Sequence, residues 1–100
     1  MSEQKIIEKI VQANHGTYVI FFVYGCPYCE KALSLLRSSH VLYKGYNINE
    51  IDGGMKNLLI VLDKHKDQLN FDSSHKTKPI IFYNGKFIGG FSELSKILNI

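Results

Sequence analysis

The sequence runs YVIFFVYGCPYC from Tyr18 to Cys29, and this stretch decides the fold. Residues 18–24 are β-branched or aromatic throughout, which favours a central β-strand that is covered on both faces. Gly25 supplies a turn after the strand, and Pro27 suits the first turn of a helix, where its missing N–H has no partner to lose. The stretch therefore predicts a buried strand that leads directly into a helix.

The chain has two cysteines, Cys26 and Cys29, and both lie at the start of that helix. Unpaired backbone N–H groups and the helix dipole at a helix N-terminus stabilise an anion, so they favour a thiolate over a thiol. A thiolate is the nucleophile of thiol–disulfide exchange, and a second thiol at this spacing can resolve a mixed disulfide. The pair therefore predicts reversible thiol–disulfide exchange that begins at Cys26.

Length and composition limit the classes of protein that fit. The 100 residues, of which 45% are hydrophobic, suffice for one small domain with a single core. The net charge is +3 and the basic residues are scattered, so we expect no nucleic-acid partner. Apolar runs are too short to span a bilayer and the acid-bearing N-terminus is unlike a signal peptide, so we expect no membrane association. Two cysteines without a disulfide framework indicate a reducing compartment, and we expect a cytoplasmic protein.

Helical and strand patterns alternate along the chain and predict the order α-β-α-β-α-β-β-α. The expected helices cover residues 3–13, 27–37, 55–62 and 92–98, and the expected strands cover residues 17–24, 41–48, 80–83 and 86–88. Residues 63–76 are charged and polar and are interpreted as a helix end followed by a loop. Ser92 is expected to cap the last helix, with Leu94, Ile97 and Leu98 facing the core.

The connections between these elements predict the sheet. A helix joins the first two strands, so these strands should be parallel with a right-handed crossover. Asn84-Gly85 is a preferred hairpin turn, so the last two strands should be antiparallel. The strand at residues 41–48 is the most polar and should lie near an edge. The expected fold class is α/β, with a four-stranded mixed sheet flanked by helices.

Three motifs at matching spacing carry a resemblance to a known family. They are Cys26-Pro27-Tyr28-Cys29, Thr77-Lys78-Pro79, and Gly89-Gly90-Phe91-Ser92-Glu93. In this order, and on this succession of elements, the chain resembles a dithiol glutaredoxin. The resemblance implies a thioredoxin-like fold, a single glutaredoxin domain over residues 1–100, and a cis peptide bond before Pro79.

The resemblance also implies a glutathione-binding site. Lys78 would offer its backbone to the cysteine of glutathione, and Gly90 would let the backbone approach closely. The helix N-terminus after Gly90 would hold the γ-glutamyl carboxylate, with Glu93 in place of the usual Asp near the ammonium. The implied glutathione-binding residues are Tyr28, Thr77, Lys78, Pro79, Gly90, Phe91, Ser92 and Glu93.

The implied activity is glutathione-dependent thiol–disulfide oxidoreduction, which serves electron transport and cell redox homeostasis. Cys26 would attack a mixed disulfide. Cys29, more buried and with a higher pKa, would resolve the product as a Cys26–Cys29 redox disulfide. Glutathione is the expected co-substrate, and no metal is expected. The expected partners are glutathionylated or disulfide-bonded proteins, ribonucleotide reductase being one example, and the protein is expected to be a monomer.

Two positions depart from the family pattern. Many glutaredoxins carry Lys or Arg three residues before the first cysteine, where this chain has Val23. The family's usual Val before the cis proline is replaced here by Lys78. We therefore predict that Lys78 supplies part of the missing positive charge near Cys26.

Other functions remain open on the sequence alone. One is a thioredoxin-like reductase that works without glutathione, although that family resembles Trp-Cys-Gly-Pro-Cys and this chain has no Trp. Another is a [2Fe–2S] carrier, which Pro27 and Cys29 argue against. A zinc knuckle would need two further ligands, and the four histidines have no knuckle-like spacing.

Overall fold

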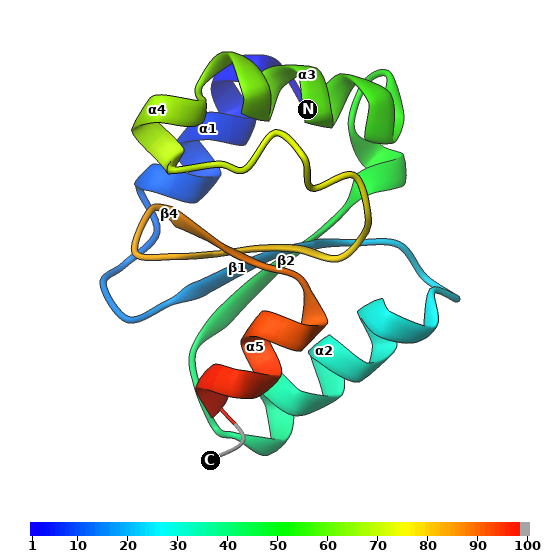
Figure 1. Cartoon of the computed structure of the whole chain (residues 1–100), viewed down its shortest axis with the longest axis vertical. Helices are drawn as coiled ribbons and strands as arrows, with labels where there is room; N and C mark the ends of the chain where they lie inside the picture. Colours follow the sequence, from blue (N-terminus) through cyan, green and yellow to red (C-terminus); the bar gives the residue numbers. More distant parts are fainter. Residues whose placement is uncertain (99–100) are drawn as a thin grey trace.

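A four-stranded mixed sheet forms the centre of the computed structural model, which describes residues 1–98 (Figure 1). Its strands are β1 (Tyr18–Phe22), β2 (Tyr43–Asn47), β3 (Ile80–Tyr83) and β4 (Lys86–Gly89). They are arranged in the order β2-β1-β3-β4. β1 is parallel to β2 and antiparallel to β3, and β3 is antiparallel to β4. This is the predicted sheet, and β2 lies at its edge as expected.

Helices cover both faces of the sheet. The helical segments are α1 (Glu3–Val11), α2 (Pro27–Ser38), the short 3-10 helix η1 (Ile48–Glu50), α3 (Gly54–Lys64), α4 (Lys66–Leu69) and α5 (Phe91–Leu98). Figure 1 shows α1, α3 and α4 above the sheet, and α2 and α5 below it. None of the helices within residues 1–98 is both long and apolar enough to cross a membrane.

β1 is buried along its whole length because it contributes to both sides of the fold. Successive strand residues point to opposite faces. Val19 and Phe21 therefore pack under α1 and α3, whereas Tyr18, Ile20 and Phe22 pack against α2 and α5. The uniformly apolar sequence of this strand follows from that double coverage.

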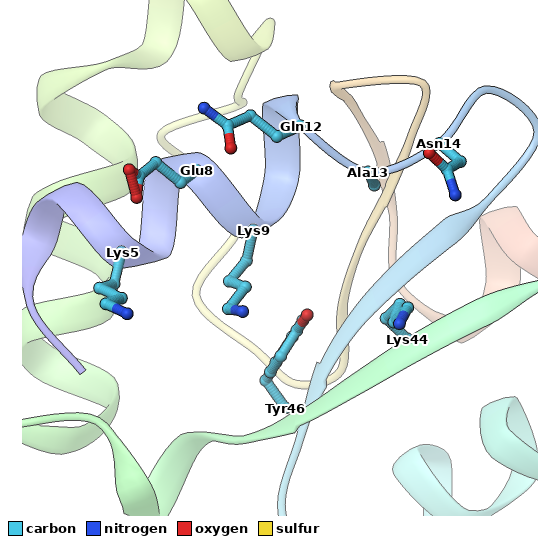
Figure 2. Close-up of a pocket in the computed structure, with 8 residues that line it drawn as sticks. All are labelled: Lys5, Glu8, Lys9, Gln12, Ala13, Asn14, Lys44 and Tyr46. Carbon is cyan, nitrogen blue, oxygen red and sulfur yellow. The ribbon is translucent and has the colours of Figure 1, made fainter.

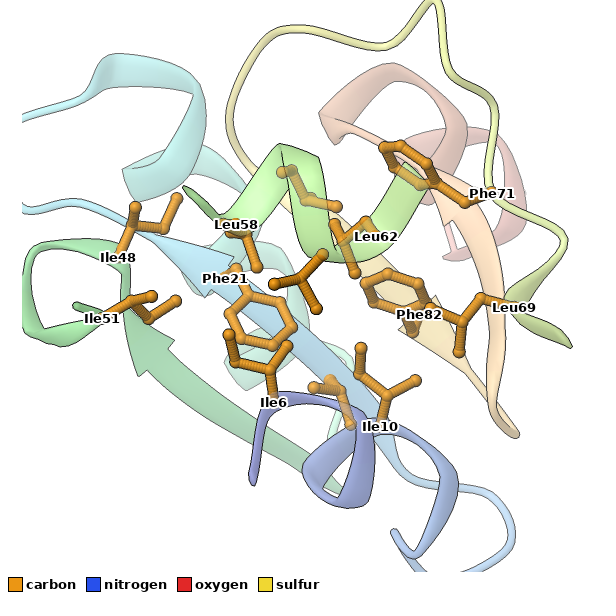
Figure 3. Packing of buried hydrophobic residues seen from close by; sticks show 13 residues of the cluster. Ile6, Ile10, Phe21, Ile48, Ile51, Leu58, Leu62, Leu69, Phe71 and Phe82 are labelled. Atoms are coloured by element: carbon orange, nitrogen blue, oxygen red, sulfur yellow. The ribbon is translucent and has the colours of Figure 1, made fainter. Parts of the chain in front are cut away.

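The larger of the two apolar clusters lies between the sheet and the upper helices (Figure 3). Phe21 from β1 and Phe82 from β3 meet edge to face there, with ring centroids 6.1 Å apart. Leu58 and Leu62 of α3 are fully buried against them. Each such side chain contributes about 1.5–3 kcal/mol through its transfer out of water. This cluster stabilises the sheet, including β1, which leads into the loop that carries Cys26.

Two expectations about the last helix are wrong. α5 begins at Phe91, so Ser92 lies inside its first turn and does not cap it. The Gly90 N–H, just before the helix, instead donates to Glu93 Oε1 at 2.8 Å. The Glu93 side chain therefore provides the hydrogen-bond partner that this backbone N–H would otherwise lack. Ile97 was expected to face the core, but 46% of its surface is exposed. Leu94 is buried as expected.

The segment 63–76 is more helical than expected. α3 continues to Lys64, and α4 follows directly before the chain becomes irregular. Leu69 of α4 and Phe71 after it are buried, and they anchor a stretch that is otherwise polar. Asn70 between them adopts a left-handed conformation and ends α4, which a short polar side chain tolerates better than most.

Truncation of a buried leucine in α3 tests this account of the core. We expect Leu62→Ala to lower the free energy of unfolding by about 2–5 kcal/mol, because it removes buried contacts and leaves a cavity. Ile60→Ala is the matched control on the same helix, because Ile60 is 56% exposed, and it should cost less than about 1 kcal/mol. Chemical denaturation of both variants is the measurement, and equal losses would contradict the account.

Candidate active site

Cys26 lies where the buried strand β1 passes into α2. It is the N-cap residue of α2, and Pro27 occupies the first turn, as predicted. Gly25 makes the approach possible, because its φ of +79° favours glycine. The Gly25 N–H donates to Glu30 Oε1 at 3.4 Å, which ties the loop to the first turn of the helix. The fold therefore holds the Cys26 sulfur at a helix N-terminus.

Several groups act on the Cys26 thiol, and together they lower its pKa below the ordinary value. Partial burial is the largest single influence and acts in the opposite direction. Hydrogen bonds from the Cys29 thiol and from the backbone N–H groups of Cys29 and Tyr28 stabilise the thiolate, and the Lys78 ammonium adds an attractive charge. The N–H contributions are those of a helix N-terminus.

The second cysteine has the opposite environment. Cys29 lies in the first turn of α2 and is fully buried. Burial raises the pKa of its thiol to about 12, with a further contribution from its hydrogen bond to Cys26. Cys29 therefore stays protonated while Cys26 ionises, and it donates its S–H to the Cys26 thiolate. Both cysteines are reduced in this structure. The Cys26 thiol is therefore the more acidic of the two, and the Cys29 thiol is the more buried.

The segment that precedes β3 borders the other side of Cys26. The Lys78–Pro79 peptide bond is cis, as the resemblance implied. The Cys26 Sγ lies 4.0 Å from the Lys78 carbonyl oxygen, within reach of a weak hydrogen bond from the thiol. Lys78 itself is exposed. Its charge is among the groups that lower the Cys26 pKa, which agrees with the role predicted for it in the absence of a cation at Val23.

A pocket of about 210 Å³ opens between this segment and the start of α5. All eight residues that the resemblance assigned to glutathione line it: Tyr28, Thr77, Lys78, Pro79, Gly90, Phe91, Ser92 and Glu93. They come from α2, from the loop before β3 and from the β4–α5 junction, and the fold brings them together.

His75 also lines this pocket, although no motif in the sequence points to it. Its ring lies 5.1 Å from the ring of Phe87, and its Nε2 is 3.4 Å from the Pro79 carbonyl oxygen. A histidine in a polar loop is normally a surface residue. Only the tertiary fold places it behind the cis proline.

Two aromatic rings border the pocket on the α2 side. Tyr28 and Phe91 have ring centroids 6.1 Å apart at a tilt of 33°. The Lys31 ammonium lies 5.4 Å from the centre of the Tyr28 ring and 6.0 Å from that of Phe91. Such contacts favour one mutual orientation of the rings. The pocket is therefore lined by two aromatic rings as well as by polar groups such as Thr77, Ser92 and Glu93.

A buried strand, a cysteine pair at a helix N-terminus and a cis proline opposite the nucleophile define a thiol–disulfide oxidoreductase of thioredoxin-like fold. The glutaredoxin family model matches residues 18–88. A probable glutaredoxin of Acanthamoeba polyphaga mimivirus is 52% identical over 95 residues, which are 95% of this chain and 90% of that protein. Glutaredoxin-1 of Gallus gallus is 31% identical, over 92% of this chain and 85% of its own length. The chain belongs to the glutaredoxin family.

Solved structures agree with this assignment. The dithiolic glutaredoxin 2-C-Grx1 of Trypanosoma brucei brucei is 27% identical, with a TM-score of 0.65 over 97% of this chain and 86% of its own. A buckwheat glutaredoxin–glutathione complex has a TM-score of 0.68 at 23% identity, over 97% of this chain and 86% of that one. At that identity the second likeness supports the fold alone.

The contribution of Lys78 to the thiolate can be measured directly. We expect Lys78→Met to raise the pKa of Cys26, because an attractive charge beside the thiolate is removed. As pH falls, the variant should therefore lose its thiolate at a higher pH than the wild type. The ultraviolet absorbance of the thiolate against pH reports this. Lys66→Met on α4 is the control, and identical titrations of all three proteins would contradict the prediction.

Proposed function

We propose that this glutaredoxin uses glutathione to reduce protein–glutathione mixed disulfides and protein disulfides. The observation that carries the proposal is the pocket beside Cys26, because every residue expected to bind glutathione lines it. Its volume of about 210 Å³ suits a tripeptide that lies partly in solvent. Lys78, which lines it, has its carbonyl oxygen 4.0 Å from the Cys26 Sγ. A buckwheat glutaredoxin of the same fold has been solved as a complex with glutathione, so this fold can hold that ligand.

Backbone groups and charged side chains of the pocket would bind glutathione. The cysteine of glutathione would pair with the backbone of Lys78 as a short β-ladder, which sets its sulfur against Cys26. The N–H groups at the start of α5, where Ser92 lies, would receive the γ-glutamyl carboxylate. Glu93 would face the ammonium of the same group. Tyr28 and Phe91 would cover the apolar side of the ligand.

The chemistry then proceeds by two thiol–disulfide exchanges. The Cys26 thiolate attacks the glutathionyl sulfur of a mixed disulfide, the substrate protein leaves as a thiolate that takes up a proton, and Cys26 now carries glutathione. A second glutathione thiolate attacks this new disulfide. It releases oxidised glutathione and restores the Cys26 thiolate.

Cys29 offers a second route. Besides burial, the hydrogen bond and charge of Cys26 hold the Cys29 pKa high. Both of these contributions vanish once the Cys26 sulfur is bonded to a substrate, so the reserve thiol becomes easier to ionise at that stage. The Cys29 thiolate then attacks the Cys26 sulfur, the bound substrate leaves as a thiolate that takes up a proton, and the Cys26–Cys29 disulfide forms. Two glutathione molecules reduce this disulfide and leave as oxidised glutathione. This route would serve protein disulfides.

Turnover of a small glutathione mixed disulfide, coupled to glutathione reductase and NADPH, tests the proposal. We expect the wild type to turn over, Cys26→Ser to lose activity by at least about a thousandfold, and Cys29→Ser to keep most of it. The loss in Cys26→Ser follows from the missing nucleophile. A wild type that turns over only with thioredoxin reductase would contradict the glutathione dependence and favour a thioredoxin-like reductase.

Glu93 has two roles in this account, and two substitutions separate them. Glu93→Gln keeps an oxygen for the Gly90 N–H but removes the charge. It should therefore raise KM for glutathione about fivefold at an unchanged melting temperature. Glu93→Ala should also lower the stability by about 0.5–2 kcal/mol, because the helix end loses its partner. If Glu93→Gln leaves KM unchanged, the carboxylate serves only the helix.

A further inference from the structure

The outer edge of β2 is an unused strand edge. β2 is the first strand in the order β2-β1-β3-β4, so it has a strand neighbour on one side only. The Tyr18 N–H donates to the Leu42 carbonyl at 2.9 Å. Strand alternation then directs the backbone groups of Tyr43, Gly45 and Asn47 away from β1. Gly45 is exposed and carries no side chain to shield these groups.

A basic groove lies along this edge on the α1 side. The groove has a volume of about 290 Å³ and is lined by Lys5, Glu8, Lys9, Gln12, Ala13, Asn14, Lys44 and Tyr46. Figure 2 shows the Lys9 side chain extending from α1 toward Tyr46 of β2. The Lys9 ammonium is 5.8 Å from the centre of the Tyr46 ring. Lysines from α1 and from β2 therefore line the same groove.

Three lysines and one acid, Glu8, line the groove, so its net charge is positive. The ion pairs among residues 1–98 involve the N-terminus, Lys64 and His65, and none includes Lys5, Lys9 or Lys44. Lys5 and Lys9 are four residues apart on α1, where like charges repel. An anionic group placed between α1 and β2 would relieve that repulsion.

The two faces of the edge differ in chemistry. On the α1 face, Lys44 and Tyr46 lie opposite the helix lysines. On the other face, Tyr43 and Phe22 belong to the apolar cluster under α2 and α5, and a side-chain carbon at Gly45 would stand 3.1 Å from the Phe22 ring. A strand added here would therefore meet positive charge on one face and the partly buried Tyr43 side chain on the other.

We propose that this edge binds an extended acidic segment of a partner protein, which adds to the sheet as a fifth strand beside β2. Acidic residues at alternate positions would face Lys5, Lys9 and Lys44, and apolar residues between them would face Tyr43. Backbone hydrogen bonds would give affinity, and the charges would select the partner. The proposal does not depend on the use of glutathione.

A second copy of this chain is the poorer occupant of the same edge. Antiparallel pairing of β2 with another β2 would bring Lys44 and the α1 lysines of two molecules together. Like charges on paired strands are destabilising. The charge of the groove therefore favours an acidic partner over self-association.

The probe is a short, capped, fluorescent peptide with glutamate at alternate positions and valine or threonine between them. We expect saturable binding to the whole protein by anisotropy, weakened by added salt. Lys9→Glu and Lys44→Glu should each weaken binding about fivefold or more, because attraction is replaced by repulsion. Lys66→Glu on α4 changes the charge by the same amount away from the groove and should have little effect. Activity toward a small disulfide should be unchanged in all three variants.

Two further measurements separate strand pairing from simple charge attraction. A peptide N-methylated at the positions that would donate to β2 keeps its charge but cannot pair, and it should not bind. Amide exchange at Tyr43 and Gly45 should slow when the unmodified peptide binds. Equal binding of the N-methylated peptide, an equal effect of Lys66→Glu, or unchanged exchange at Gly45 would overturn the proposal. No detectable binding would also overturn it, and would assign Lys44 to protection of the edge against aggregation.

Discussion

The position of one sulfur at the N-terminus of α2 is the constraint on which the rest of this structure depends. β1 is buried on both faces, so its end is held firmly, and Gly25 turns the chain directly into the helix. Cys26 therefore has little freedom to leave the N–H groups that stabilise its thiolate. The apolar clusters on the two sides of the sheet serve the site by fixing this junction.

Two chemically identical thiols have opposite shifts in pKa because their surroundings differ. Cys26 and Cys29 are separated by less than one helical turn, but only Cys29 is fully buried. Burial keeps Cys29 protonated, and its S–H helps to stabilise the neighbouring thiolate. Lys78, in the segment before β3, contributes a positive charge near Cys26, whereas Val23 carries none. The pair therefore depends on contacts from both sides of the nucleophile.

Much of this arrangement could be predicted from the sequence, because the strand, the C-x-x-C motif and the hairpin are local signals. The start of α5 could not be predicted, because Ser92 is itself a good capping residue. Only the fold shows that the helix begins at Phe91 and that the Glu93 side chain accepts the hydrogen bond from the Gly90 N–H. The short helix α4 is held in place by Leu69 and, just after it, Phe71. Both are buried, but two apolar residues in an otherwise polar segment are too weak a pattern to predict a helix. His75 reaches the pocket through tertiary packing, which leaves no pattern in the sequence.

The central claim is that Cys26 is the ionised nucleophile and Cys29 a protonated, buried reserve. Alkylation of the reduced protein at mildly acidic pH, followed by peptide mass spectrometry, measures both cysteines in one sample. The account predicts that Cys26 is modified rapidly under these conditions, while Cys29 stays unmodified until the protein is denatured. Equal modification of the two cysteines, or preferential modification of Cys29, would contradict it.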